Sequence, residues 1–172
     1  MSEQRNARWS GFFRLAPLLL IAALLALALL PTVPALRIES AAVRRVLPLA
    51  EGQRFSIQYL HSVNRSPVID TIERTGETLT VRSSLFRTYG AGIPILDDGV
   101  GRAYTETAEG FLLTGIDAPH EEIALITGTY ADHRLLYGND EFILKRTFGE
   151  QTLLRLTAGR CSLLELLRYR LR

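Results

Sequence analysis

A histidine and a serine stand side by side in the segment YLHSVNRSPVID, residues 59–70, and this pair raises the question of nucleophilic catalysis. A serine nucleophile needs a histidine nitrogen within about 3 Å of its hydroxyl oxygen. Neighbouring side chains of a regular strand point to opposite faces, so His61 cannot activate Ser62 there. The chain also has no G-x-S-x-G elbow. The pattern therefore does not favour a serine hydrolase.

The same segment favours a buried or binding role for His61. Alternation with period two places it on a face, expected to be buried, that carries three large side chains: Phe55, Ile57 and Tyr59. A buried imidazole without a partner costs about 1–3 kcal/mol, so we expect His61 to be hydrogen-bonded. One expected partner is a carboxylate on the next strand, either Glu73 or Asp70. The alternative is a ligand or a partner protein at the strand's end, in which case His61 and Ser62 are binding residues.

A second cluster lies in FRTYGAGIP, residues 86–94. Its glycines permit backbone angles closed to other residues, and such a loop can direct N–H groups at an anion. Without a Lys-Ser or Lys-Thr pair and a following helix it is not a phosphate-binding P-loop. A loop that only shapes a strand end is the alternative. The candidate binding residues here are Arg87, Tyr89, Gly90 and Gly92.

The other polar clusters do not predict metal, cofactor or nucleic-acid binding. Residues 120–122 (His-Glu-Glu) and 132–133 (Asp-His) lack H-x-H or H-E-x-x-H spacing, and we expect them in solvated loops. After residue 30 the basic and acidic side chains balance, whereas a nucleic-acid-binding domain is usually basic. The sequence thus predicts no catalytic residues, metal site or cofactor.

The elements that carry these residues follow an apolar segment at residues 15–36, which contains no charge. As a helix it would measure about 33 Å, enough for a hydrocarbon core of about 30 Å. Arginines precede it, which favours a cytoplasmic N-terminus. We expect a cytoplasmic segment (1–14), a single-pass anchor in the inner membrane (15–36), a juxtamembrane linker (37–53) and a periplasmic domain (54–172). Val33-Pro34-Ala35 also resembles a signal-peptidase site, so a cleaved signal peptide remains an alternative.

The exported part alternates apolar and polar residues over short stretches. Turn signals separate these stretches at Gly76 and at residues 108–110, 138–140 and 149–150. This pattern predicts an all-β fold, an antiparallel sandwich or partly open barrel.

The C-terminal segment has a helical pattern instead. Ser162 and Glu165 match a capping box, and leucines follow at helical spacing. A short C-terminal helix is predicted, and its Arg-rich end is expected either to be solvated or to contact anionic headgroups or an acidic partner. The lone cysteine, Cys161, cannot form an intrachain disulfide, and we expect it to be buried.

Two motifs together resemble the bacterial family called domain of unknown function 1850. They are F-x-I-x-Y-x-H-S-V with a following Pro-Val, at residues 55–68, and F-x-x-Y-G-A-G-x-P, at residues 86–94. The SLLE of residues 162–165 is similar to the family's closing segment, so the resemblance covers roughly residues 38–172. It implies a small membrane-attached or exported protein without associated enzymatic activity. Such proteins are often encoded beside tripartite ATP-independent periplasmic (TRAP) transporters of the TAXI type.

Together these observations predict a membrane-anchored periplasmic binding or accessory module for a TRAP-type (TAXI) solute uptake transporter. Its expected partners are the inner membrane and the transporter's permease or solute-binding subunit, not nucleic acid. The alternative is a small-ligand sensor or enzyme of the cell envelope that uses His61 with a carboxylate such as Glu73.

Overall fold

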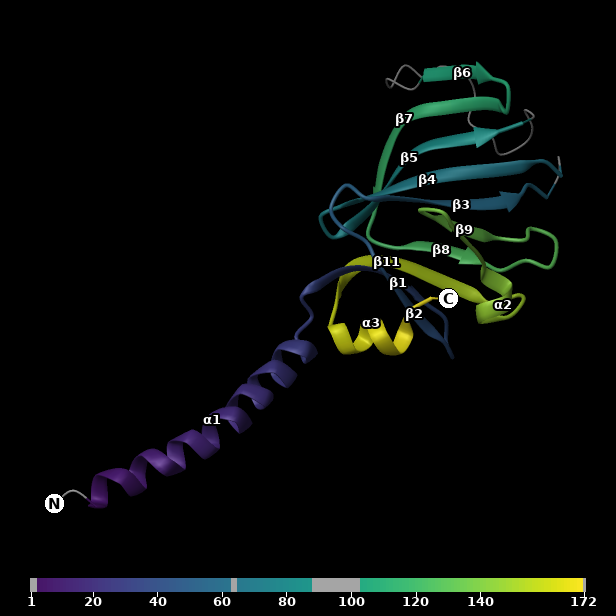
Figure 1. The fold of residues 1–172 in the computed structure, drawn as a ribbon. Helices are drawn as coiled ribbons and strands as arrows, with labels where there is room; N and C mark the ends of the chain where they lie inside the picture. The colour runs from purple at the N-terminus through teal and green to yellow at the C-terminus, as the bar shows by residue number, and fades with distance from the viewer. Residues whose placement is uncertain (1–2, 63–64, 88–102, 172) are drawn as a thin grey trace.

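The computed structural model describes residues 3–62, 65–87 and 103–171, with side chains from residue 16 onward in these ranges. A long helix, α1 (Glu3–Leu29), leads into a body made mainly of antiparallel strands (Figure 1). A short helix, α3 (Leu163–Tyr169), lies near the C-terminus. The all-β prediction for the body and the prediction of a C-terminal helix are both confirmed.

The smaller sheet has four strands in the order β2-β1-β11-β8. Its pairings are antiparallel, and β1 pairs with β11 along its whole length. The first and last strands of the body are therefore neighbours. The strands of this sheet are β1 (Val33–Glu39), β2 (Arg44–Pro48), β8 (Ile123–Ile126) and β11 (Leu153–Cys161).

The larger sheet has seven strands in the order β10-β9-β3-β4-β5-β7-β6. The expected turns at Gly76 and at residues 108–110 and 138–140 connect β4 to β5, β6 to β7 and β9 to β10. The register shifts once between β4 and β5 and once between β5 and β7, and such bulges bend the strands locally. Its strands are β3 (Arg54–Leu60), β4 (Pro67–Thr75), β5 (Thr78–Phe86), β6 (Ala103–Thr107), β7 (Gly110–His120), β9 (Arg134–Tyr137) and β10 (Asp140–Ile143).

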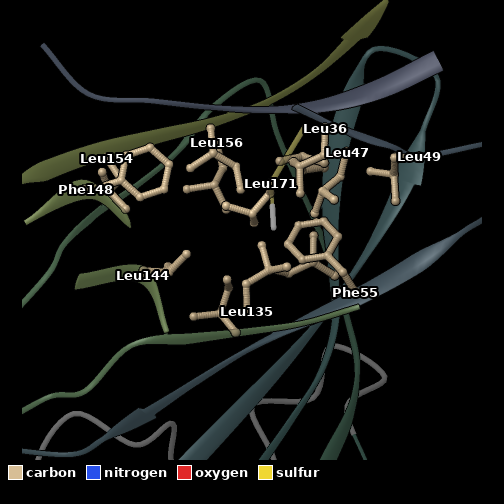
Figure 2. Packing of buried hydrophobic residues seen from close by; sticks show 14 residues of the cluster. Leu36, Leu47, Leu49, Phe55, Leu135, Leu144, Phe148, Leu154, Leu156 and Leu171 are labelled. Carbon is tan, nitrogen blue, oxygen red and sulfur yellow. The ribbon is translucent and has the colours of Figure 1, made fainter. Parts of the chain in front are cut away.

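The main hydrophobic core fills the space between the two sheets (Figure 2). Leu36 and Leu156 of the four-stranded sheet face Phe55 and Leu135 of the seven-stranded sheet, and these side chains are almost fully buried. Burying one such side chain contributes about 1.5–3 kcal/mol. Packing across the two sheets therefore holds the body together.

A buried arginine also links the sheets. Arg74 of β4 donates one hydrogen bond to the Leu49 carbonyl (2.9 Å) and one to the Gly159 carbonyl of β11 (2.8 Å). A third bond reaches the Gly76 carbonyl of its own hairpin (2.9 Å). The guanidinium thus satisfies backbone acceptors from three chain segments inside the body.

The N-terminal boundary differs from the sequence prediction. Helix α1 ends at Leu29, just before the Leu30-Pro31 step, where proline disfavours helical angles in the preceding residue. Residues 33–36 belong to β1 instead of a transmembrane segment, and the expected linker at 37–53 contains the rest of β1 and all of β2. None of the helices in the described ranges is both long and apolar enough to cross a membrane.

The C-terminal part contains one unexpected element. A short helix, α2 (Leu144–Phe148), follows β10 and places both of its end residues in the core. The capping box of α3 is present: Ser162 Oγ accepts from the Glu165 N–H (3.1 Å), and the Glu165 carboxylate accepts from the Ser162 N–H (3.0 Å). Cys161 is fully buried, as predicted.

Candidate functional site

The most distinctive site is a pocket of about 440 Å³ between the two sheets, which we call the inter-sheet pocket. Its floor is the core face of β3, β4 and β5, and residues 122–125 close it from the other sheet. Most of its walls are aliphatic: Ile57, Ile72, Val81, Ile123 and Leu125. Five polar side chains also line it: those of Tyr59, Asp70 and His133 are partly buried, and those of His120 and Glu122 are exposed.

Asp70 is a carboxyl group on the core face of β4. It alternates with the buried Val68 and Ile72, so strand geometry directs it inward. Ser84, its cross-strand neighbour on β5, donates a hydrogen bond to one carboxyl oxygen (2.6 Å). Burial raises the pKa of Asp70, and the Ser84 hydrogen bond opposes that shift.

Tyr59 stands beside this carboxyl group, on β3. Burial raises the pKa of its phenol to about 12, and the nearby Asp70 charge adds to the rise. The phenol is therefore fully protonated at neutral pH, so its hydroxyl can donate a hydrogen bond.

His133 completes the polar part of the pocket from the residue just before β9. Its ring stacks on Tyr59 with centroids 5.5 Å apart and an interplanar angle of 27°. Burial lowers the pKa of His133, and the charge of Asp132 only partly opposes this, so the neutral imidazole is favoured. Its Nδ1 atom is buried and has no hydrogen-bond partner among the described residues. A buried polar atom without a partner is costly, which makes Nδ1 a natural contact for a ligand.

The mouth of the pocket is more polar than its interior. His120 and Glu122 line it and are exposed, and Glu122 forms an ion pair with Arg155 of β11 (2.9 Å). The expectation of a solvated loop is confirmed for Glu122, which lies between β7 and β8, whereas His120 is solvated but is the last residue of β7. The same expectation is wrong for His133, whose ring is partly buried against Tyr59. Within the described ranges no group of three or more His, Cys, Asp or Glu side chains is arranged to hold a metal ion.

The histidine-serine pair singled out from the sequence lies elsewhere, just beyond the end of β3. His61 and Ser62 line a separate hollow of about 370 Å³ together with Arg65 and the exposed Tyr130. Two backbone bonds tie this turn: the His61 N–H donates to the Ser66 carbonyl, and the Arg65 N–H to the His61 carbonyl, both at 2.9 Å. We call this hollow the strand-end pocket.

Glu73 and Asp70, the two carboxylates expected as partners of His61, do not line this pocket. Asp70 lines the inter-sheet pocket instead, and Glu73 lies still farther from His61. It lies opposite Arg54 at the other end of the β3–β4 ladder, whereas Leu60 next to His61 pairs with Pro67. Six residues of strand separate the two ends, which is about 20 Å. Glu73 instead forms ion pairs with Arg54 (2.7 Å) and Arg82 (2.9 Å), and their hydrogen bonds lower the pKa of its carboxyl. His61 and Glu73 therefore cannot act in one site.

Of the glycine-loop segment, residues 86–94, only Phe86 and Arg87 lie in the described ranges. Arg87 is exposed at the bend after β5. Tyr89, Gly90 and Gly92 lie outside the described residues, so their expected role stays a prediction.

Fold and site together define an antiparallel two-sheet protein with a partly polar pocket between its sheets. The model of the family "Domain of unknown function (DUF1850)" matches residues 55–144, and the chain belongs to this family. The match includes every residue of the inter-sheet pocket and every residue of the strand-end pocket. Comparison with curated proteins and with solved structures found no significant match.

Proposed function

We propose that the chain is a binding module that takes a small organic molecule into the inter-sheet pocket. The observation that carries this proposal is the unpartnered Nδ1 of His133, buried in a largely apolar pocket beside Asp70 and Tyr59. Pockets of a few hundred cubic ångströms with apolar walls and a few convergent polar groups are typical ligand sites.

The lining also suggests the chemistry of the ligand. The neutral Nδ1 of His133 lacks a proton if the ring carries it on Nε2, and it then accepts a hydrogen bond. The Asp70 carboxylate is a second acceptor, and the Tyr59 hydroxyl is a donor. A molecule with a short aliphatic body and a hydroxyl or amine group matches this set. Among the described residues no serine, cysteine, threonine or lysine lines the pocket, and we therefore favour binding over nucleophilic catalysis.

We propose further that the module is attached to the inner membrane through α1, with its body on the periplasmic side. Eight apolar side chains between Leu18 and Leu29 are more than half exposed, and the described body does not cover them. Within α1 the uncharged run from Leu15 to Leu29 measures about 22 Å. A helix over residues 11–30 would measure about 30 Å and would contain one charged residue, Arg14. Reporter fusions at the C-terminus test this: alkaline phosphatase should be active and a cytoplasmic reporter inactive.

The proposed partners are a TRAP transporter's permease or its TAXI-type solute-binding subunit. Support for this part comes from the family resemblance. Co-purification of the intact chain from detergent-solubilised membranes tests it, and recovery without either subunit would count against it.

The ligand proposal is tested by thermal stabilisation of the full chain in detergent against a panel of small alcohols, amines and hydroxy acids. His133→Phe keeps an aromatic ring next to Tyr59 but removes Nδ1, so it should abolish stabilisation by any ligand found. His61→Phe in the strand-end pocket is the matched control and should keep it. Equal stabilisation of wild type and His133→Phe would refute this site.

The alternative function, a small-ligand sensor or enzyme that uses His61, would place its ligand in the strand-end pocket. It predicts the reverse result: His61→Phe should lose the thermal stabilisation by ligand, and His133→Phe should keep it. The separation of His61 from Glu73 removes one of the two carboxylates suggested for it, and the other, Asp70, lines the inter-sheet pocket.

A further inference from the structure

Helix α3 is fixed so that part of its apolar surface faces outward. Leu171, just after the helix, is buried in the core, and its N–H donates to the Val46 carbonyl of β2 (3.1 Å). Leu163, Leu164 and Leu167 of the helix are nevertheless 47%, 52% and 77% exposed. The described body therefore leaves this leucine face uncovered.

Four arginines lie beside the leucine face. Arg45 of β2, Arg146 of α2, Arg168 of α3 and Arg170 just after it line a shallow hollow of about 540 Å³ together with Thr147 and Leu167. None of the four forms an ion pair with a carboxylate within the described ranges. By contrast, many other arginines of the body are paired with acids: Arg44, Arg54, Arg82, Arg134 and Arg155.

The position of α1 indicates what this surface meets. Helices α1 and α3 are in contact, and both lie on the same side of the body (Figure 1). If α1 is held in a bilayer, α3 is therefore at the level of the lipid headgroups. Exposed leucines next to unpaired arginines are typical of elements that lie in that interface. An acidic protein would explain the charge but not the contact with the membrane helix.

We propose that α3, Arg45 and Arg146 form a lipid-docking face that binds the phosphate headgroups of anionic phospholipids, while the three leucines enter the headgroup boundary. This inference rests on the membrane attachment proposed above. Each arginine near an anionic surface is expected to increase partitioning about five-fold, and salt should weaken the effect.

The test uses the full chain in nanodiscs of phosphatidylcholine alone or with about one third phosphatidylglycerol. A polarity-sensitive fluorophore is attached at Leu167→Cys; the native Cys161 is fully buried and does not compete. We expect a blue shift and quenching by spin-labelled lipid in anionic discs, much less in neutral discs or high salt. The same label at Tyr130→Cys, 89% exposed in the loop after β8, should respond to neither.

Two charge-matched double variants isolate the arginines. Arg168→Gln with Arg170→Gln should lower the equilibrium constant for docking in anionic discs about twenty-five-fold, which is about five-fold for each arginine. Arg65→Gln with Arg87→Gln, two exposed arginines away from α3, should leave it unchanged. Circular dichroism confirms that both variants fold.

Co-elution of the chain with the discs reports membrane attachment separately from docking. A chain that fails to enter discs refutes the attachment, whereas a chain that enters them without a label response overturns the docking face. Equal responses in neutral and anionic discs would also overturn headgroup binding. A response to poly-glutamate but to no lipid would assign the face to an acidic protein instead.

Discussion

Replacing Arg74 by methionine should lower the free energy of unfolding by about 2–4 kcal/mol. The side chain is 5% exposed, and its guanidinium makes hydrogen bonds of 2.9 and 2.8 Å to the Leu49 and Gly159 carbonyls. Leaving a buried acceptor without a partner costs about 1–3 kcal/mol, so two carbonyls account for about 2–6 kcal/mol. Removing a buried charge recovers part of this, which lowers the expected value. Methionine fills the space of the apolar stem and keeps cavity effects small.

Urea unfolding of the full chain in mild detergent, followed by far-ultraviolet circular dichroism, measures the change. Arg155→Met is the matched control, because Arg155 is 59% exposed and its ion pair with Glu122 should contribute less than about 1 kcal/mol. Arg74→Lys should restore only part of the loss, since one ammonium cannot reproduce the planar fork of donors. A stability of Arg74→Met within about 0.5 kcal/mol of wild type would show that the carbonyls find other partners and refute the reasoning.

Two further changes test the pocket and a turn. Asp70 has a raised pKa, so it favours the folded state at acidic pH, and that contribution is lost as pH rises through its folded-state pKa. Thermal melts should therefore show wild type losing stability relative to Asp70→Asn from about pH 4 upward; a constant difference would argue against burial of the charge. Gly110→Ala should cost about 1–3 kcal/mol in urea unfolding, because φ is +138° and the added Cβ would lie 2.5 Å from the Phe86 carbonyl oxygen. Gly138→Ala, with open space at its Cβ, should cost less, and equal losses would contradict the steric argument.

Local signals in the sequence were sufficient for most strands and turns of the larger sheet. Alternation predicts a strand only if one face is buried, and the core faces of β3 and β4 meet this condition. The turns at Gly76 and Gly138 were recognisable because both glycines adopt positive φ, which other residues avoid. The capping box of α3 was visible for a similar reason, since it depends on residues only three positions apart.

Boundaries set by distant contacts were not predictable. Residues 33–36 are as apolar as the helix before them, and only pairing of β1 with β11, more than 120 residues later, makes them a strand. Helix α2 is too short to be stable alone, and burial of Leu144 and Phe148 stabilises it.

The inter-sheet pocket was missed for the same physical reason. One signal was present: Asp70 occupies a core position in the alternation of β4, between Val68 and Ile72. Its meeting with His133 requires β9 to lie beside β3, and β3 beside β4. Local periodicity does not encode this order, because each strand could pair with several others. The histidine-serine motif is the more visible local signal, but its two residues line the strand-end pocket.

The junction between helix and body limits how this protein can work. Only residues 30–32 separate α1 from β1, and the Arg160 guanidinium of β11 donates to the Thr32 carbonyl (2.8 Å) and the Pro31 carbonyl (3.3 Å). Residues 30–32 are thus too short and too well hydrogen-bonded to act as a flexible linker between α1 and the body. The direction in which α1 leaves the body is therefore set by the fold of the body itself.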